Sequence, residues 1–171
     1  MADKVLSVLN KICENTKPGK KVVQKLFYLI ERKGLDLGLD YVMHYYGPYS
    51  SELDQKLRVC EDFDCINIDT SGMAHTISIA DSFKSTENPF ADDESQVIDN
   101  IIKLYACKSP LDLELLTTTD YVANSILSNI KKNEKNIIDG VKEIKGEKFS
   151  VEKIQQSISE LTNQSFISLN E

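Results

Sequence analysis

The chain has 171 residues, of which 41% are hydrophobic and 27% are charged, and its formal net charge at pH 7 is −7. A chain of this length and composition can bury a globular core without disulfides or a structural metal. The sequence argues against a membrane-spanning protein, because no apolar run approaches the roughly 20 residues that cross a bilayer. The amphipathic N-terminus also lacks the apolar core of a signal peptide, so we expect a cytoplasmic protein.

The charge is unevenly distributed along the chain. Residues 1–33 carry eight basic and three acidic side chains, residues 34–120 carry five and seventeen, and residues 121–171 carry seven of each. An acidic body repels nucleic acid at long range. Any contact with nucleic acid would therefore have to use the N-terminal third.

The first third of the chain predicts two helices. Residues 3–14 have an amphipathic apolar stripe, and Thr16 followed by Pro18 is typical of a helix end and a new start. Residues 18–33 place their apolar side chains on one half of a helical wheel. The opposite half carries a basic stripe beside Tyr28, and Gly34 is suited to end the helix.

The next segment predicts a winged helix. Residues 41–46 are aromatic and β-branched, which favours a strand, and Gly47-Pro48 breaks it. Ser50 or Ser51 caps a helix that runs to about residue 61. Residues 65–79 alternate apolar and polar on both sides of a Ser-Gly turn, which predicts a β-hairpin in the position of a wing.

The rest of the chain predicts more helices. A polar linker covers residues 81–92, and an Asp93-x-x-Gln96 capping box starts a helix over 93–107. Further helices are predicted over 109–128 and 134–145 and from Ser150 onward. We therefore expect a mostly helical α+β fold, with a winged-helix-like part (1–80) and a helical part (93–171) packed on it as one compact domain.

Several segments together resemble one bacterial family, the YwgA-like proteins. They are Lys25-Leu-Phe-Tyr-Leu, Tyr46-Gly-Pro-Tyr-Ser50, Leu113-Glu-Leu-Leu-x-Thr-x-Asp-Tyr121 and Lys145-x-x-Lys-Phe-Ser-Val-Glu-Lys-Ile154. More distantly, residues 20–60 are similar to the Panacea domain of SocA-type antitoxins. The resemblance implies a compact, mostly helical domain and, for Panacea proteins, neutralisation of a toxin through protein contacts. It implies no catalytic activity.

The tyrosine-rich turn is the first candidate site. Tyrosine is favoured at protein interfaces, and the turn leads into a helix with an acidic first turn. The partner-binding candidates are His44, Tyr46, Gly47, Pro48, Tyr49, Ser50, Glu52 and Asp54. The alternative interpretation is that alternate strand residues pack in the core while Gly-Pro sets a tight turn.

The basic stripe of the second helix is the second candidate, as a contact for nucleic-acid phosphates. Its residues are Lys17, Lys20, Lys21, Lys25 and Arg32. The alternative is an ordinary solvated helix face. This alternative is favoured because the helix over 50–61, which would enter the major groove, is acidic, and the hairpin over 65–79 has no Lys or Arg.

Metal and catalytic sites find little support. The acids Asp81, Glu87, Asp92, Asp93 and Glu94 follow no EF-hand pattern and suit a helix start. The four cysteines form no zinc-binding spacing, so we expect buried thiols, with a Cys60–Cys65 redox pair as the alternative. Glu114, Asp120 and Tyr121 could form an acid–base group, but packing is the favoured interpretation, and we expect no enzyme, no cofactor and no metal.

The sequence thus favours a non-enzymatic protein-interaction module of antitoxin or adaptor type that binds a protein partner. The acids of residues 50–64 would attract a partner with a basic surface. A DNA-binding transcription regulator is the alternative. Homodimerisation through the amphipathic terminal helices stays open.

Overall fold

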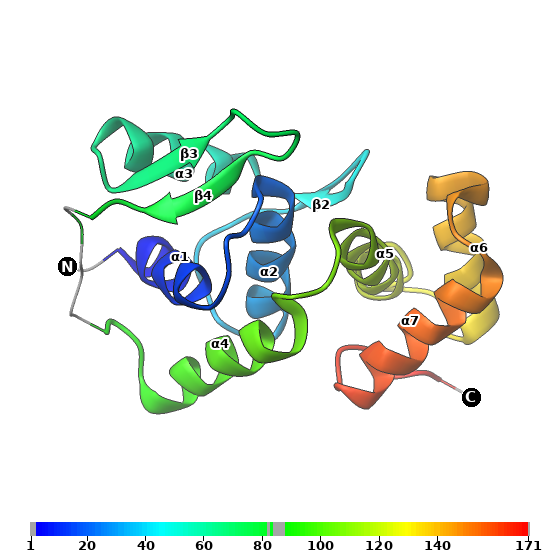
Figure 1. Ribbon diagram of the computed structural model, residues 1–171. Helices are drawn as coiled ribbons and strands as arrows, with labels where there is room; N and C mark the ends of the chain where they lie inside the picture. Colours follow the sequence, from blue (N-terminus) through cyan, green and yellow to red (C-terminus); the bar gives the residue numbers. More distant parts are fainter. Residues whose placement is uncertain (1–2, 82, 84–87, 171) are drawn as a thin grey trace. The chain divides into compact units, whose positions relative to one another are not determined.

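The computed structural model describes residues 3–81, 83 and 88–170. Within them lie seven α-helices: α1 (Lys4–Asn15), α2 (Lys20–Arg32), α3 (Ser51–Asp62), α4 (Asp92–Tyr105), α5 (Pro110–Tyr121), α6 (Glu134–Lys145) and α7 (Val151–Asn163). Short strands in the same residues form two antiparallel hairpins, β1 (Val42–His44) with β2 (Gly47–Tyr49) and β3 (Ile66–Asp69) with β4 (Thr76–Ile79). The protein is a mostly helical α+β protein, as the sequence predicts (Figure 1).

The internal contacts divide the chain into two compact units. The first is Met1–Val42 with Tyr49–Pro110, and the second is Met43–Pro48 with Leu111–Glu171. The sequence places the helix after residue 93 with the C-terminal part, whereas the contacts place α4 in the first unit. The reason is packing, because α4 contacts α1 and α2 and its Ile98, Ile101 and Ile102 are buried. Residues 82 and 84–87 of the predicted linker, Glu87 among them, lie outside the described residues.

The first unit has the element order of a winged helix. α1, α2 and α3 are followed by the β3–β4 hairpin, which contacts α1 and α3 (Figure 1). The hairpin pairs Ile66 with Ile79 and Ile68 with Ile77, and Ile66 and Ile77 are buried because side chains alternate between the two faces of a strand. The predicted hairpin over 65–79 is confirmed.

The connection between α1 and α2 joins this hairpin. Gly19 forms a bridge with Thr76, the Lys20 amide donates to the His75 carbonyl at 3.0 Å, and the Ile77 amide donates to the Pro18 carbonyl at 2.9 Å. These bonds fix the N-terminal end of α2 against the wing.

Two local predictions are wrong in detail. The strand over 41–46 is instead the short β1–β2 hairpin, with Tyr45 and Tyr46 as its turn and Gly47-Pro48 inside β2. A proline is tolerated there because a two-stranded hairpin consists of edge strands. α4 begins at Asp92 rather than at Asp93, and the Glu94 carboxylate accepts the Ala91 amide at 3.0 Å.

The second unit contains α5, α6 and α7. α5 is buried over residues 113–120, and its Thr117 and Thr119 hydroxyls donate to carbonyls four residues earlier at 2.7 and 2.8 Å, which satisfies them inside the core. The helix predicted over 109–128 continues beyond Tyr121 as a π-helical turn, η1 (Val122–Ile126). The 3₁₀ turn η2 (Gly146–Lys148) follows α6, and Ser150 caps α7 as predicted. No helix of the described residues is long and apolar enough to cross a membrane.

Candidate functional site

The turn of the β1–β2 hairpin presents two tyrosines. The side chains of Tyr45 and Tyr46 are 74% and 42% exposed, and their rings pack edge to face with centroids 4.9 Å apart. Side chains from two segments of the second unit that are distant in the sequence support this turn, one from α5 and the other from the end of α6 and η2.

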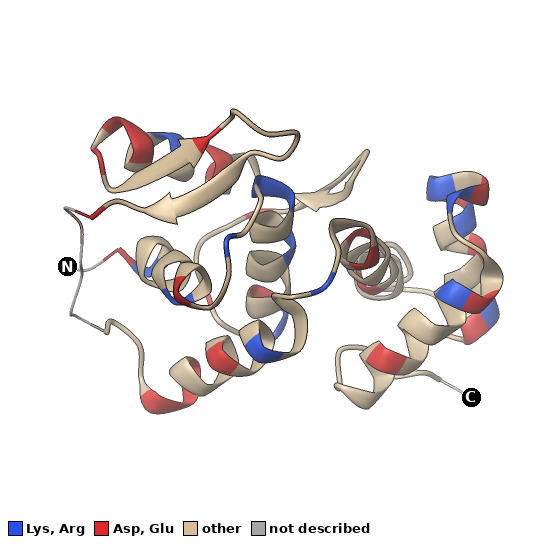
Figure 2. Ribbon diagram, in the orientation of Figure 1, with Lys and Arg blue, Asp and Glu red and all other residues tan. Residues whose placement is uncertain are grey.

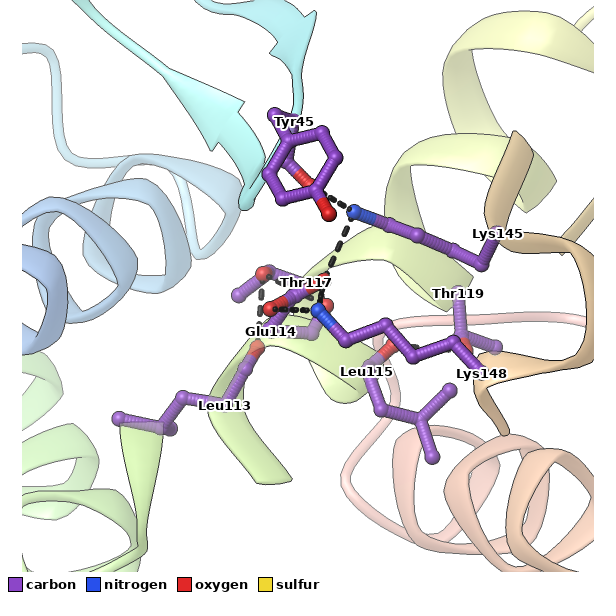
Figure 3. A network of polar contacts seen from close by, with 8 residues as sticks. All are labelled: Tyr45, Leu113, Glu114, Leu115, Thr117, Thr119, Lys145 and Lys148. Carbon is purple, nitrogen blue, oxygen red and sulfur yellow. Dashed lines mark hydrogen bonds and ion pairs between the residues drawn. The ribbon is translucent and has the colours of Figure 1, made fainter. Parts of the chain in front are cut away.

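Glu114, near the start of α5, is the centre of this support (Figure 3). Its carboxylate accepts a hydrogen bond from Lys145 at 2.8 Å and two from Lys148 at 2.7 and 2.9 Å. The Lys145 ammonium also donates to the backbone carbonyl of Tyr45 at 2.6 Å. We call Glu114, Lys145 and Lys148 the charged cluster.

The charged cluster contains two cations and one anion. Burial raises the pKa of the Glu114 carboxyl, but hydrogen bonds and charge from Lys145 and Lys148 outweigh this, so that its pKa lies below the ordinary value. The carboxylate is therefore ionised at neutral pH, and the cluster with both lysines protonated carries a surplus of one positive charge. Lys148 also lies over the rings of Tyr45 and Tyr46 at 5.7 Å from each centroid, where the π faces attract a cation.

Gly47 brings the hairpin close to α5. Its φ is +89°, and a Cβ at this position would lie 3.1 Å from the Thr118 hydroxyl oxygen and 3.4 Å from the Glu114 carbonyl oxygen. Glycine is suited to this position because it tolerates positive φ and leaves room for the helix. Gly47 and Pro48 are buried, so these two partner-binding candidates serve packing. The tight turn that the alternative interpretation assigned to them lies instead at Tyr45 and Tyr46.

Ser50 is also a structural residue. It is 0% exposed, its amide and carbonyl are both paired with the Gln24 side-chain amide at 2.9 Å, and its hydroxyl accepts the Leu53 amide at 3.2 Å. The same hydroxyl donates to Glu52 at 2.9 Å. Ser50 therefore starts α3 and cannot contact a partner, whereas Glu52 and Tyr49 are half-buried and His44 is exposed.

α3 presents a different surface at its C-terminal end. Val59 and Phe63 are 47% and 76% exposed and lie one helical turn apart. Exposed acids lie beside them in the sequence, namely Glu61, Asp62 and Asp64, and Figure 2 shows acidic residues in red at the end of α3. We call these five residues the α3 end surface. Asp54, further back on α3, is neutralised by Arg58 at 2.8 Å and by Lys20 at 3.6 Å.

The predicted basic stripe is divided in the structure. Lys17, Lys20 and Lys21 line a groove of about 740 Å³, where Lys108 joins them from the α4–α5 connection, and the wing residues Met73–Thr76 form another wall. Lys25 is 3% exposed and Arg32 is half-buried. The part of the stripe that remains accessible is therefore confined to the N-terminal end of α2.

The other candidates do not assemble into a site. Glu114 contacts the two lysines, whereas the Asp120 carboxylate accepts a hydrogen bond from Asn124 at 2.9 Å, and Asp120 is fully buried. In the described part of the chain no group of three or more His, Cys, Asp or Glu residues could hold a metal ion. The four cysteines are free thiols.

Sequence reasoning missed the roles of Tyr45, Lys145 and Lys148. One signal was present, since Glu114 is a single acid within the apolar run Leu113-Glu-Leu-Leu, and a buried carboxylate requires a cationic partner. The partner could not be identified from sequence spacing, because Lys145 and Lys148 lie 31 and 34 positions away.

Comparison with known proteins adds no assignment. No protein-family model matches the sequence, and no curated protein matches it closely enough to be called a relative.

Proposed function

We propose that this protein is a cytoplasmic, non-enzymatic protein-interaction module of adaptor or antitoxin type, and that the α3 end surface binds a basic protein partner. The observation that carries the proposal is the exposed apolar pair Val59 and Phe63 within a set of exposed acids. An apolar centre with a charged rim is the usual organisation of a protein interface, and aromatic side chains are among the residues that contribute most to binding.

The charge of this surface selects the partner. No Lys or Arg occurs in the sequence between Arg58 and Lys84, so the end of α3 and the whole wing lack cations. Complementary charge steers the encounter between proteins and disfavours partners of the same charge. A basic protein surface is therefore favoured, and the phosphates of DNA are repelled.

A capture experiment tests the proposal. The immobilised protein is exposed to a lysate of its source cells, and the variant Val59→Ser/Phe63→Ser is compared with Leu104→Ser, which removes an exposed apolar side chain from α4. We expect the double variant to capture about tenfold less partner than the native protein, or less still. The α4 variant should capture as much partner as the native protein. Equal capture by both variants would refute the assignment of the surface.

DNA binding is the second candidate, and the gathering of Lys17, Lys20, Lys21 and Lys108 around one groove favours it. Fluorescence anisotropy with mixed-sequence duplex DNA at about 50 and about 200 mM salt separates the two functions, because several phosphate contacts lower the affinity by orders of magnitude over this range. Lys21→Glu should abolish such binding, whereas Lys103→Glu, an exposed residue outside the groove, should not. An absence of binding at the lower salt would remove this candidate.

A further inference from the structure

We propose that the second unit contains a binding site for a small organic monocarboxylate, in the pocket beside the charged cluster. The pocket has a volume of about 710 Å³ and is lined by Met43, His44, Tyr45, Ile144, Lys145 and Lys148. All six residues belong to the second unit. The inference is independent of the proposed function, which concerns a surface of the first unit.

The first argument is the unpaired hydrogen-bonding capacity of Lys145. Its side chain is 5% exposed, and its ammonium has two acceptors among the described residues, the Tyr45 carbonyl and the Glu114 carboxylate. An ammonium has three N–H donors, so one donor of Lys145 remains for a ligand. A buried donor without an acceptor costs free energy, and an acceptor in the pocket would recover it.

The second argument is the charge balance. Glu114 is shared between Lys145 and Lys148, which leaves one positive charge without a counter-charge in the cluster. A carboxylate carries one negative charge, whereas a phosphate group carries about −1.5 to −2 at neutral pH. The surplus thus matches a carboxylate, which would pair with the nearly buried Lys145 ammonium at the inner end of the pocket and with the more exposed Lys148.

The third argument is the remaining wall of the pocket. Met43 and Ile144 supply aliphatic surface, and the Tyr45 ring supplies an aromatic face. The volume lies within the roughly 300–1,000 Å³ of small-molecule pockets, which are mostly apolar with a few polar groups that fix orientation. An aliphatic or aromatic body attached to the carboxylate would contact this wall.

The test uses sodium benzoate as the probe, with inorganic phosphate and sodium chloride at equal ionic strength. We expect saturable amide shifts in NMR spectra with benzoate, confined to residues 43–48 and 144–149, weaker shifts with phosphate and none with chloride. The absence of saturable shifts with benzoate would overturn the proposal. Tighter binding of phosphate than of benzoate would overturn the assignment to carboxylates.

Two variants with opposite predicted effects distinguish a ligand site from a structural ion pair. Lys148→Gln removes the surplus charge and should weaken benzoate binding by about tenfold or more, whereas Lys153→Gln, exposed on α7, should not change it. Glu114→Gln raises the surplus and should tighten binding. If Glu114→Gln fails to fold, the comparison of Lys148→Gln with Lys153→Gln still tests the site. Equal affinity of these two variants for benzoate would refute it.

Discussion

The Lys145 ammonium lies 2.8 Å from the Glu114 carboxylate, and each side chain is only 5% exposed. The pair joins the end of α6 to the start of α5, and the second hydrogen bond of Lys145, to the Tyr45 carbonyl, extends the connection to the β1–β2 hairpin. Lys145 and Glu114 thus connect three parts of the second unit that are distant in the sequence: the turn at Tyr45, the start of α5 and the end of α6.

Replacing Glu114 by Gln should destabilise the fold strongly. The substitution leaves two lysines without their common counter-charge, and breaking a buried ion pair costs roughly 3–5 kcal/mol. Urea unfolding measures the loss. The matched control is Lys142→Gln, which breaks the solvent-exposed pair of Lys142 with Glu147 and should cost no more than about 1 kcal/mol. Similar losses in the two variants would contradict the role given to Glu114.

The same carboxylate predicts part of the acid sensitivity. Because the pKa of Glu114 is lower in the folded protein than its ordinary value of 4.5, its contribution to stability is complete above that value and is lost as the pH falls through the folded pKa. The free energy of unfolding should therefore fall more steeply below about pH 4.5 in the native protein than in Glu114→Gln. Parallel pH profiles would contradict this.

The Gln24 side chain should be important for the start of α3. It pairs with both backbone polar groups of Ser50, which is fully buried. In Gln24→Ala both groups lose their partner, and each unsatisfied buried group costs about 1–3 kcal/mol. Thermal or urea unfolding should show this loss. The control is Asn10→Ala, which removes an exposed hydrogen bond to Glu14 and should change little.

A methyl group at position 47 should disturb the hairpin. Gly47→Ala places a Cβ at a φ of +89°, 3.1 Å from the Thr118 hydroxyl oxygen, and the left-handed conformation alone costs about 1–2 kcal/mol. Gly34→Ala provides the comparison, because its φ is also positive and no atom lies within 4 Å of the added Cβ. The difference in unfolding free energy between the variants reports the contact with α5, and equal losses would contradict it.

Local sequence signals predicted most of the fold. The alternating isoleucines of residues 65–79 specified the β3–β4 hairpin because one face of a two-stranded hairpin is buried, and the caps Ser50 and Ser150 were recognisable because a serine hydroxyl satisfies the first amides of a helix. The β1–β2 hairpin was missed, since its turn contains Tyr45-Tyr46 rather than residues typical of short turns.

Tertiary relationships limited the prediction of the sites. A helical wheel assigns one buried and one solvated face to a helix, and this assumption predicted that Lys25 is accessible. In the structure Lys25 is only 3% exposed. The lysines that contact Glu114 lie on other elements of the second unit, and periodicity contains no information about such long-range pairs. Side-chain exposure on α3 likewise depends on what packs against the helix, so the exposure of Val59 and Phe63 emerged only from the structure.

The most direct test of the proposed function is site-specific photo-crosslinking in the source cells. A photoreactive phenylalanine derivative replaces Phe63 in one protein and Leu104, the exposed control position on α4, in another. The account predicts one basic protein cross-linked from position 63 and not from position 104. No cross-linked protein at position 63, or the same products from both positions, would contradict the claim that the end of α3 binds a protein partner.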